Sequence, residues 1–264
     1  MNAPEHLPLA DVQSIPDRRN IYINHVGVKS LVHPLQVRGA DGAIVSTVAS
    51  IDMTVGLSPE VKGTHMSRFV EVLQQTCGVL DMTSFGQLLT RMLQRLDADS
   101  GMIEMRFPYF ISKRAPVSGV ASLLDYKVVM RAEKRGARAT FTTTVAAPAT
   151  SLCPCSKEIS EYGAHNQRSE ITITVQGEQP FVIEELASVA EQEASCEVYG
   201  LLKRPDEKYV TERAYDNPKF VEDLVRDIAL RLDADPRVRV YAVAAENFES
   251  IHNHSAYALI ERVK

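Results

Sequence analysis

The sequence contains few cysteines, no long apolar run and no excess of basic residues, and each absence excludes a class of protein. Four cysteines in 264 residues do not make a disulfide framework, and Cys153 and Cys155 are too close together to pair without strain. No apolar run reaches the roughly 18 residues of a membrane-spanning helix. A net charge of -5 argues against a nucleic-acid-binding protein, which would normally carry a broad basic surface. We therefore expect a protein of a reducing compartment with neither a membrane nor a nucleic acid as partner.

The N-terminal segment, residues 1–20, has neither the basic region nor the apolar region of a signal peptide. We interpret it as a loose, proline-containing leader and predict a cytoplasmic location. The hydrophobic content of the chain, 45%, is ample for a packed core. Because the chain as a whole is acidic, any anionic ligand would have to meet a local cluster of positive charge.

Apolar periodicity in residues 21–136 predicts two strands, two helices and two further strands, in that order. The first two strands alternate in places between apolar and polar residues and flank the turn sequence GADGA, which is typical of a hairpin. Thr83 or Ser84 is the expected N-cap of the second helix. The predicted elements cover residues 25–37, 43–55, 64–75, 83–98, 101–112 and 123–133.

The same order of elements recurs in residues 137–264. One strand of this half places Ile171, Ile173 and Val175 on one face. The last helix is expected to begin at the Asn-Pro pair at 217–218, with asparagine as the cap and proline at the first helical position. The predicted strands and this helix cover residues 137–147, 169–175, 217–235, 238–248 and 255–263.

The repeated order predicts an α+β fold of two tandem ββααββ units, with the boundary near Gly136. The pentapeptide RLDAD, which ends the second helix of each half, also supports a duplication. The element order carries more weight than this short match.

A long polar connection between the first two strands of the second half concentrates the metal-binding residue types. Its sequence, SLCPCSKEISEYGAHNQRS, contains Cys153, Cys155 and His165. Such connections lie on the surface and often carry function. The two cysteines are one residue apart and only one histidine follows, so the pattern by itself has low specificity for a zinc site. The alternative is that one cysteine fills an apolar gap and the histidine caps a turn.

Two further segments add donors of other kinds. The sequence LLKRPDEKYVTERAYDNPKFVED mixes acidic and basic residues, which is usually typical of a solvated face, and includes Glu207. The sequence AENFESIHNHSAY, between the last two strands, adds His252. A thiolate, an imidazole and a carboxylate can hold a catalytic metal with one position open, where bound water becomes a nucleophile near neutral pH.

These motifs, together with GLSPEVKGTHMSRF in the first half, resemble those of GTP cyclohydrolase type IB, a family of the tunnelling-fold (T-fold) superfamily. The resemblance covers nearly the whole chain beyond the leader. It implies antiparallel sheets with helices on one face, which close into barrels across the subunits of a homo-oligomer, by analogy a tetramer. It also implies hydrolysis of GTP to 7,8-dihydroneopterin triphosphate and formate, the first step of pterin and tetrahydrofolate biosynthesis, which also feeds queuosine-type deazaguanines.

The resemblance further implies roles for individual residues. Cys153, His165 and Glu207 would bind a divalent metal, with His165 alternatively transferring a proton and His252 acting in the same site. Glu222 would accept hydrogen bonds from the N1 and N2 hydrogens of guanine, although a helix residue stabilised by the N-terminal dipole is the simpler interpretation. The carboxylate ligand makes Mn²⁺ or Fe²⁺ as suitable as Zn²⁺.

No glycine-rich phosphate loop occurs in the sequence, so the triphosphate would be held by separate basic side chains. Arginine offers a bidentate fork to phosphate oxygens, and lysine offers point charge. The predicted triphosphate ligands are Lys203, Arg204, Lys208, Arg213, His65 and Arg68.

Two other functions remain open at this point. The nitrile reductase of the same superfamily also presents a cysteine and an anchoring glutamate, but it uses NADPH and no metal. A binding module could instead hold a structural zinc through Cys153, Cys155 and His165. Dependence of activity on a metal separates the first alternative from the cyclohydrolase, and loss of the fold with the metal identifies the second.

Overall fold

The structure of the protein, a computed structural model, describes residues 13, 15–76 and 78–264, so most of the predicted leader lies outside the described residues. The strands are β1 (Ile23–Arg38), β2 (Ile44–Leu57), β3 (Val79–Leu80), β4 (Gly101–Arg114), β5 (Ala121–Arg135), β6 (Arg138–Leu152), β7 (Asn166–Gly177), β8 (Cys196–Glu197), β9 (Val240–Asn247) and β10 (Ala256–Val263). The helices are α1 (Met66–Thr76), α2 (Met82–Leu96), α3 (Pro154–Ile159), α4 (Ile183–Glu193), α5 (Arg204–Asp216) and α6 (Val221–Ala234).

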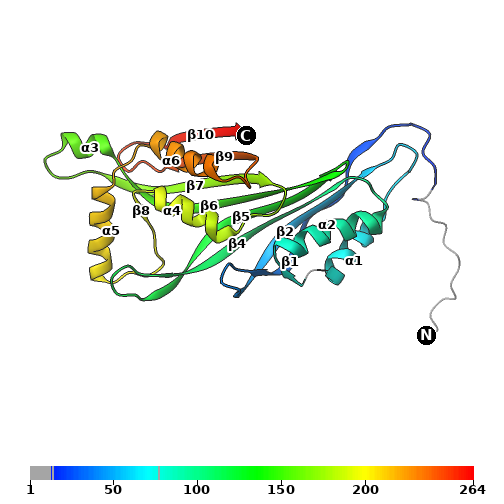
Figure 1. The fold of residues 1–264 in the computed structure, drawn as a ribbon, viewed down its shortest axis with the longest axis horizontal. Helices are drawn as coiled ribbons and strands as arrows, with labels where there is room; N and C mark the ends of the chain where they lie inside the picture. Colours follow the sequence, from blue (N-terminus) through cyan, green and yellow to red (C-terminus); the bar gives the residue numbers. More distant parts are fainter. Residues whose placement is uncertain (1–12, 14, 77) are drawn as a thin grey trace.

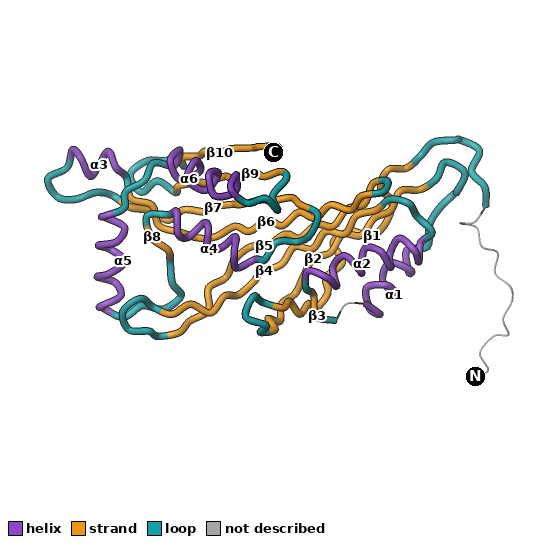
Figure 2. Tube along the Cα trace, in the orientation of Figure 1, coloured by secondary structure: helices purple, strands orange, loops and turns teal. Residues whose placement is uncertain are grey.

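The strands form one long sheet in the order β10-β9-β7-β6-β5-β4-β2-β1-β3, and β8 pairs with β6. Neighbouring strands are antiparallel except for β1 and β3. The helices α1, α2, α4 and α6 lie on one face of this sheet (Figure 1, Figure 2). The predicted α+β class with helices on one face is confirmed. The ββααββ order recurs in both halves, with β3 added in the first half and α3, β8 and α5 added in the second. Closure into oligomeric barrels stays a prediction.

The sheet buries one face because its strands alternate between buried and exposed side chains. Ile171, Ile173 and Val175 on β7 are each 0% exposed. They belong to one hydrophobic cluster with side chains from the covering helices, including Phe85 of α2 and Ile228 of α6. Each such side chain contributes about 1.5–3 kcal/mol through burial. Within the described part of the chain, no helix combines the length and the apolar character that crossing a membrane requires.

The two halves of the chain meet in the middle of the sheet. Strands β5 and β6 pair from Lys127 with Ala146 to Arg135 with Arg138, and the turn between them contains Gly136 at φ 65°. Glycine adopts this left-handed conformation without steric cost. The sheet therefore continues without interruption from one half to the other.

The predicted N-cap of α2, Thr83 or Ser84, is wrong. Asp81 is the N-cap, and its carboxylate accepts the backbone N–H groups of Thr83 at 2.9 Å and Ser84 at 2.8 Å. The Ser84 hydroxyl accepts the Asp81 backbone N–H at 2.7 Å, which completes a capping box. Ser84 thus occupies the third helical position rather than the cap.

The predicted start of the last helix is also wrong. Helix α6 begins at Val221 with Phe220 as its cap, whereas Asn217 ends the preceding helix, α5. The backbone N–H of Asn217 donates to the Ala214 and Arg213 carbonyls, which makes Asn217 the C-cap of α5. Its side-chain N–H₂ group donates to the Ala194 carbonyl at 2.9 Å and ties this end of α5 to the end of α4. The mixed acidic and basic segment ahead of Asn217, interpreted as a solvated run, forms α5.

Candidate active site

Cys153 and His165 lie at the two ends of one loop. Cys153 follows directly after β6 and is the N-cap of the short helix α3, where its sulfur accepts the Ser156 backbone N–H at 3.5 Å. Its own backbone N–H donates to the His165 carbonyl at 3.2 Å. Strands β6 and β7 bring the two ends together because Leu152 pairs with Asn166. Cys155, in the first turn of α3, is exposed.

The His165 ring is oriented by contacts to a single nitrogen. Its Nδ1 lies 2.9 Å from Gln167 Oε1, 3.3 Å from Ser250 Oγ and 3.9 Å from Glu249 Oε2. The side chains of His165 and Glu249 are only 14% and 13% exposed. A ring that donates its Nδ1 hydrogen to such acceptors keeps the Nε2 lone pair for a ligand.

Glu249 is a site residue for which the sequence predicted no role. It reaches His165 because the Phe248 backbone N–H donates to the Arg168 carbonyl at 3.0 Å, which holds the β9–β10 loop against the start of β7. Gln167 Nε2 bridges to Glu249 Oε1 at 3.4 Å. The sequence held one signal for this role: Glu249 is an acidic residue in the same β9–β10 loop as His252 and His254.

His252 lies on the same β9–β10 loop but points to a different neighbour. Its exposed ring stacks on His254, with ring centroids 5.1 Å apart and planes 15° apart. The structure thus brings His252 into the same loop as Glu249, without placing its ring on His165.

Helix α5 carries the third predicted metal ligand, Glu207, which is exposed. The far end of α5 contacts α3, where Lys157 Nζ donates to the Tyr215 carbonyl at 2.5 Å and lies 4.3 Å from the Tyr215 ring centroid. Glu207 precedes Tyr215 by eight residues, or about 12 Å of helix. Among the described residues, no group of three or more histidine, cysteine, aspartate and glutamate side chains is arranged to hold a metal ion. One chain therefore gathers Cys153 and His165, and the assignment of Glu207 stays a prediction.

The start of α5 is held by a buried carboxylate. Asp206 is 0% exposed, and burial alone would raise its pKa. The Ser118 hydroxyl and the backbone N–H groups of Ser118, Lys203 and Val117 donate to it and outweigh burial, so the pKa of Asp206 lies well below its usual range.

The predicted basic residues of this region differ in their surroundings. Lys203 and Arg204 are exposed at the start of α5. Lys208 pairs with Glu212 at 2.6 Å, and Arg213 pairs with Glu197 at 3.5 Å. A phosphate would have to compete with these carboxylates for Lys208 and Arg213, whereas in the part of the chain that the structure describes no carboxylate pairs with Lys203 or Arg204.

Glu222 lies exposed in the first turn of α6. In the first half, Arg68 lies in α1, and its backbone N–H donates to the His65 carbonyl at 3.1 Å. Figure 1 shows α1 toward one end of the molecule and α5 at the other. A single ligand therefore cannot contact both helices of the same chain.

A cavity of about 400 Å³ adjoins the His165 loop. It lies between the start of β7, at Asn166, Gln167 and Arg168, and the strand β8 and helix α5. Glu197 on β8 also lines it. A cavity of this size, with amide, guanidinium and carboxylate groups in its wall, suits a polar ligand.

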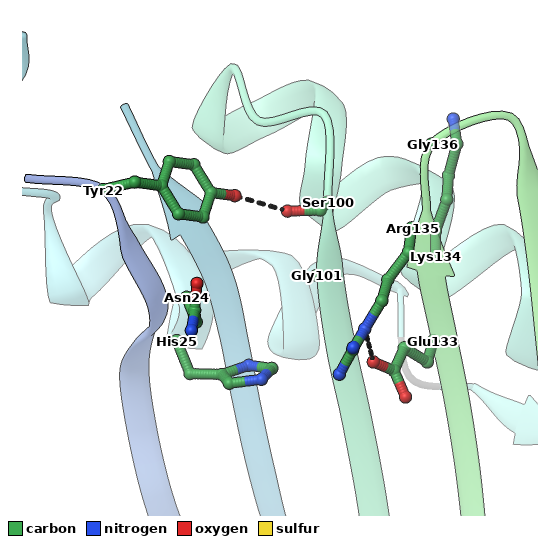
Figure 3. A pocket seen from close by; sticks show the side chains of 9 residues that line it. All are labelled: Tyr22, Asn24, His25, Ser100, Gly101, Glu133, Lys134, Arg135 and Gly136. Carbon is green, nitrogen blue, oxygen red and sulfur yellow. Dashed lines mark hydrogen bonds and ion pairs between the residues drawn. The ribbon is translucent and has the colours of Figure 1, made fainter. Parts of the chain in front are cut away.

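A second cavity, of about 310 Å³, lies between the start of β1 and the β5–β6 turn (Figure 3). Tyr22 points toward Ser100, with a distance of 3.0 Å between their side-chain oxygens, and Arg135 points toward Glu133. None of the predicted site residues lines this cavity.

The long antiparallel sheet with helices on one face defines a T-fold protein, and a solved structure supports this class. Uricase from Arthrobacter globiformis matches with a TM-score of 0.50 at 7% identity, over 90% of this chain and 93% of that chain. This likeness concerns the fold alone.

The chain belongs to the type I GTP cyclohydrolase folE2 family, whose model matches residues 9–258. GTP cyclohydrolase FolE2 1 of Dechloromonas aromatica is 62% identical over 259 residues, which are 98% of this chain and 97% of the relative. GTP cyclohydrolase FolE2 of Azoarcus sp. is 57% identical over 265 residues, 100% of this chain and 98% of the relative. The predicted membership in a type I GTP cyclohydrolase family is confirmed at this level.

Proposed function

We propose that this chain is a GTP cyclohydrolase I of type IB, which converts GTP and water into 7,8-dihydroneopterin triphosphate and formate in the first step of tetrahydrofolate synthesis. The observation that carries the proposal is the backbone hydrogen bond that holds Cys153 next to His165, in a chain whose relatives, named GTP cyclohydrolases, match it over nearly its full length. The family model that matches residues 9–258 is that of a type I GTP cyclohydrolase, which favours this reaction over that of the related NADPH-dependent reductase.

The donors at the Cys153 loop fit a divalent metal. A cysteine sulfur and an imidazole nitrogen are ligands of Zn²⁺, Fe²⁺ and Mn²⁺ enzymes, and a carboxylate from Glu207 would favour the harder ions. A bound metal would lower the pKa of a water molecule that attacks C8 of GTP. His165, held through Nδ1 by Gln167 and Glu249, would keep Nε2 directed at the metal or at a proton in transfer.

The substrate contacts that we propose follow from exposure and pairing. Glu222, exposed at the start of α6, is our candidate for the guanine edge. Lys203 and Arg204 are the strongest candidates for the triphosphate, because no carboxylate among the described residues forms an ion pair with them, unlike Lys208 and Arg213. Lys208 and Arg213 would join only if phosphate displaced their glutamate partners.

Formate release from GTP tests the proposed function. The purified protein is assayed as isolated, after removal of metal by a chelator, and after return of Mn²⁺, Fe²⁺ or Zn²⁺. We expect activity to fall on chelation and to return with one of these metals, while circular dichroism stays unchanged. Reduction of a nitrile with NADPH but no formate would support the reductase, and loss of the fold on chelation would support a structural zinc.

We also propose that the active enzyme is a homo-oligomer, by analogy a tetramer, in which two chains form each site. Arg68 on α1 and Glu222 on α6 can then serve one GTP from different chains. Co-expressed Arg68→Ala and Glu222→Ala chains should recover part of the activity that each variant lacks alone. Co-expressed Arg204→Ala and Glu222→Ala chains, whose changes fall in the same part of one chain, should recover none. Equal behaviour of the two mixtures would reject a shared site.

We infer a cytoplasmic location from the cysteines. Cys153, Cys155 and Cys196 are free thiols in the structure. Free thiols persist in reducing compartments, where glutathione and thioredoxin keep them reduced.

A further inference from the structure

The carboxylate of Asp206 joins the two halves of the chain beside the proposed GTP site. Its Oδ1 accepts the backbone N–H groups of Val117 and Ser118, both at 2.8 Å. Its Oδ2 accepts the Ser118 hydroxyl at 2.6 Å and the Lys203 backbone N–H at 2.8 Å. The Asp206 side chain is fully buried, and its carboxylate supplies the charge in all four hydrogen bonds, whose donors are neutral N–H and O–H groups. Each of its four hydrogen bonds is charge-assisted and therefore strong.

The partner segment is the β4–β5 turn, which belongs to the first half of the chain. This turn is itself well defined, because Ala115 N–H donates to the Val120 carbonyl at 2.9 Å and Gly119 N–H to the Ala115 carbonyl at 3.0 Å. Gly119 adopts φ 68°, which glycine tolerates without strain. The turn thus presents two backbone N–H groups and one hydroxyl in fixed directions.

The segment on the other side carries three of the proposed site residues. Lys203 and Arg204 precede Asp206, and Glu207 follows it. Their side chains are exposed, so packing does not fix them, and the backbone that bears them is fixed by the buried carboxylate. The contact of Lys157 with Tyr215 secures only the opposite end of α5.

We propose that Asp206 is a positioning residue of the GTP site, which holds the start of α5 on the β4–β5 turn so that Lys203 and Arg204 meet the triphosphate. This role rests on the proposed function. Asp206 itself stays buried and touches no substrate. Because Ser118 is an exposed residue, its hydroxyl can be removed from this contact with little other effect on packing.

Four variants, one of them a control, separate the contact from general stability. Asp206→Asn keeps the shape but places an N–H₂ group where two donors now point, so at least one hydrogen bond is lost. Ser118→Ala removes only the hydroxyl, and Ser118→Thr restores it. Asp216→Asn makes the same chemical change at the exposed last residue of α5 and serves as the control.

Hydrogen–deuterium exchange on the full chain without substrate measures the contact directly. We expect faster exchange at residues 115–120 and 203–210 in Asp206→Asn, a smaller effect in Ser118→Ala, and none in Ser118→Thr or Asp216→Asn. Unchanged exchange in both segments would overturn the proposal. If Asp206→Asn does not fold, Ser118→Ala alone decides.

Steady-state kinetics with GTP, at a saturating concentration of whichever of Mn²⁺, Fe²⁺ and Zn²⁺ restores activity, measure the role in binding. We expect KM to rise about tenfold in Asp206→Asn, with a much smaller change in kcat, because Lys203 and Arg204 would no longer be held toward the triphosphate. A tenfold rise corresponds to about 1.4 kcal/mol of binding free energy. Faster exchange with an unchanged KM would make the contact purely structural and overturn the positioning role. A wild-type protein that releases no formate would instead overturn the proposed function, and this role with it.

Discussion

Replacement of Cys153 by alanine separates the chemical role of this thiol from its role in folding. In the structure its sulfur accepts one N–H, from Ser156 at 3.5 Å, as the cap of the short helix α3. Loss of a capping contact costs about 1 kcal/mol, which lowers Tm by about 2–4 °C in a chain of this size. Cys153→Ala should therefore fold. If the sulfur is a metal ligand, bound metal and formate release should fall at least about a hundredfold, since even outer-shell changes cost up to that much.

The matched control is Cys155→Ala, which removes an exposed thiol two residues further on. Metal content by mass spectrometry, thermal melting by circular dichroism and formate yield are measured on both variants side by side. Cys155→Ala should retain most of its metal and activity. A Cys153 variant that keeps its metal and its activity, or a Cys155 variant that alone loses them, would refute the site.

Glu222, Asp52 and Cys196 give three separate tests. Glu222→Ala should lower kcat/KM for GTP by about a hundredfold or more with little change in Tm, because guanine would lose a specific hydrogen-bonding partner, and near wild-type turnover would remove it from the site. Burial of Asp52 acts to raise its pKa, but hydrogen bonds from the Ser30 N–H and from Arg106 outweigh this, and the pKa lies below its usual value. A carboxylate whose pKa is lower in the folded protein than in the unfolded chain stabilises the fold at pH values above its pKa in the unfolded chain, about 4. This stability is lost as the pH falls through its pKa in the folded protein. Asp52→Asn should therefore lower the free energy of unfolding at pH 7 and weaken its loss in acid, as measured by urea unfolding at pH 7 and pH 3; an unchanged pH dependence would contradict this. Burial raises the pKa of the Cys196 thiol to about 11, so iodoacetamide at pH 8 should modify the exposed Cys155 and spare Cys196 in the folded protein, as mass spectrometry would show; equal labelling would contradict the buried position.

The strands were predictable because an antiparallel sheet with one buried face imposes alternation on the sequence. Ile171, Ile173 and Val175 follow this rule and are fully buried. Helix α5 was not predictable in the same way, because Asp206 and Ala214 are its only buried residues. A helix held by contacts at its two ends, rather than by an apolar stripe, leaves no periodic signal in the sequence.

The residues of the candidate site also differ in whether local sequence could place them. Cys153 and His165 could be placed together from sequence because they end one loop between two predicted strands. The approach of Glu249 to His165 depends on the pairing of β7 with β9, where Ser169 lies opposite Asn247. That pairing joins residues far apart in the chain, and no local pattern encodes it. The position of Glu207 depends on the orientation of α5, which the buried carboxylate of Asp206 sets.

The uninterrupted sheet across the β5–β6 turn determines what partial unfolding of the molecule would expose. Separation of the two halves would expose two long strand edges, each with a row of unpaired N–H and C=O groups. Such edges are templates for pairing with other chains, so a molecule opened at this point would be prone to aggregate. Because both halves also share one hydrophobic cluster, opening would cost buried apolar area at the same time. Because the two halves share a sheet and a core, unfolding of one half destabilises the other. The partly opened, aggregation-prone form therefore stays rare.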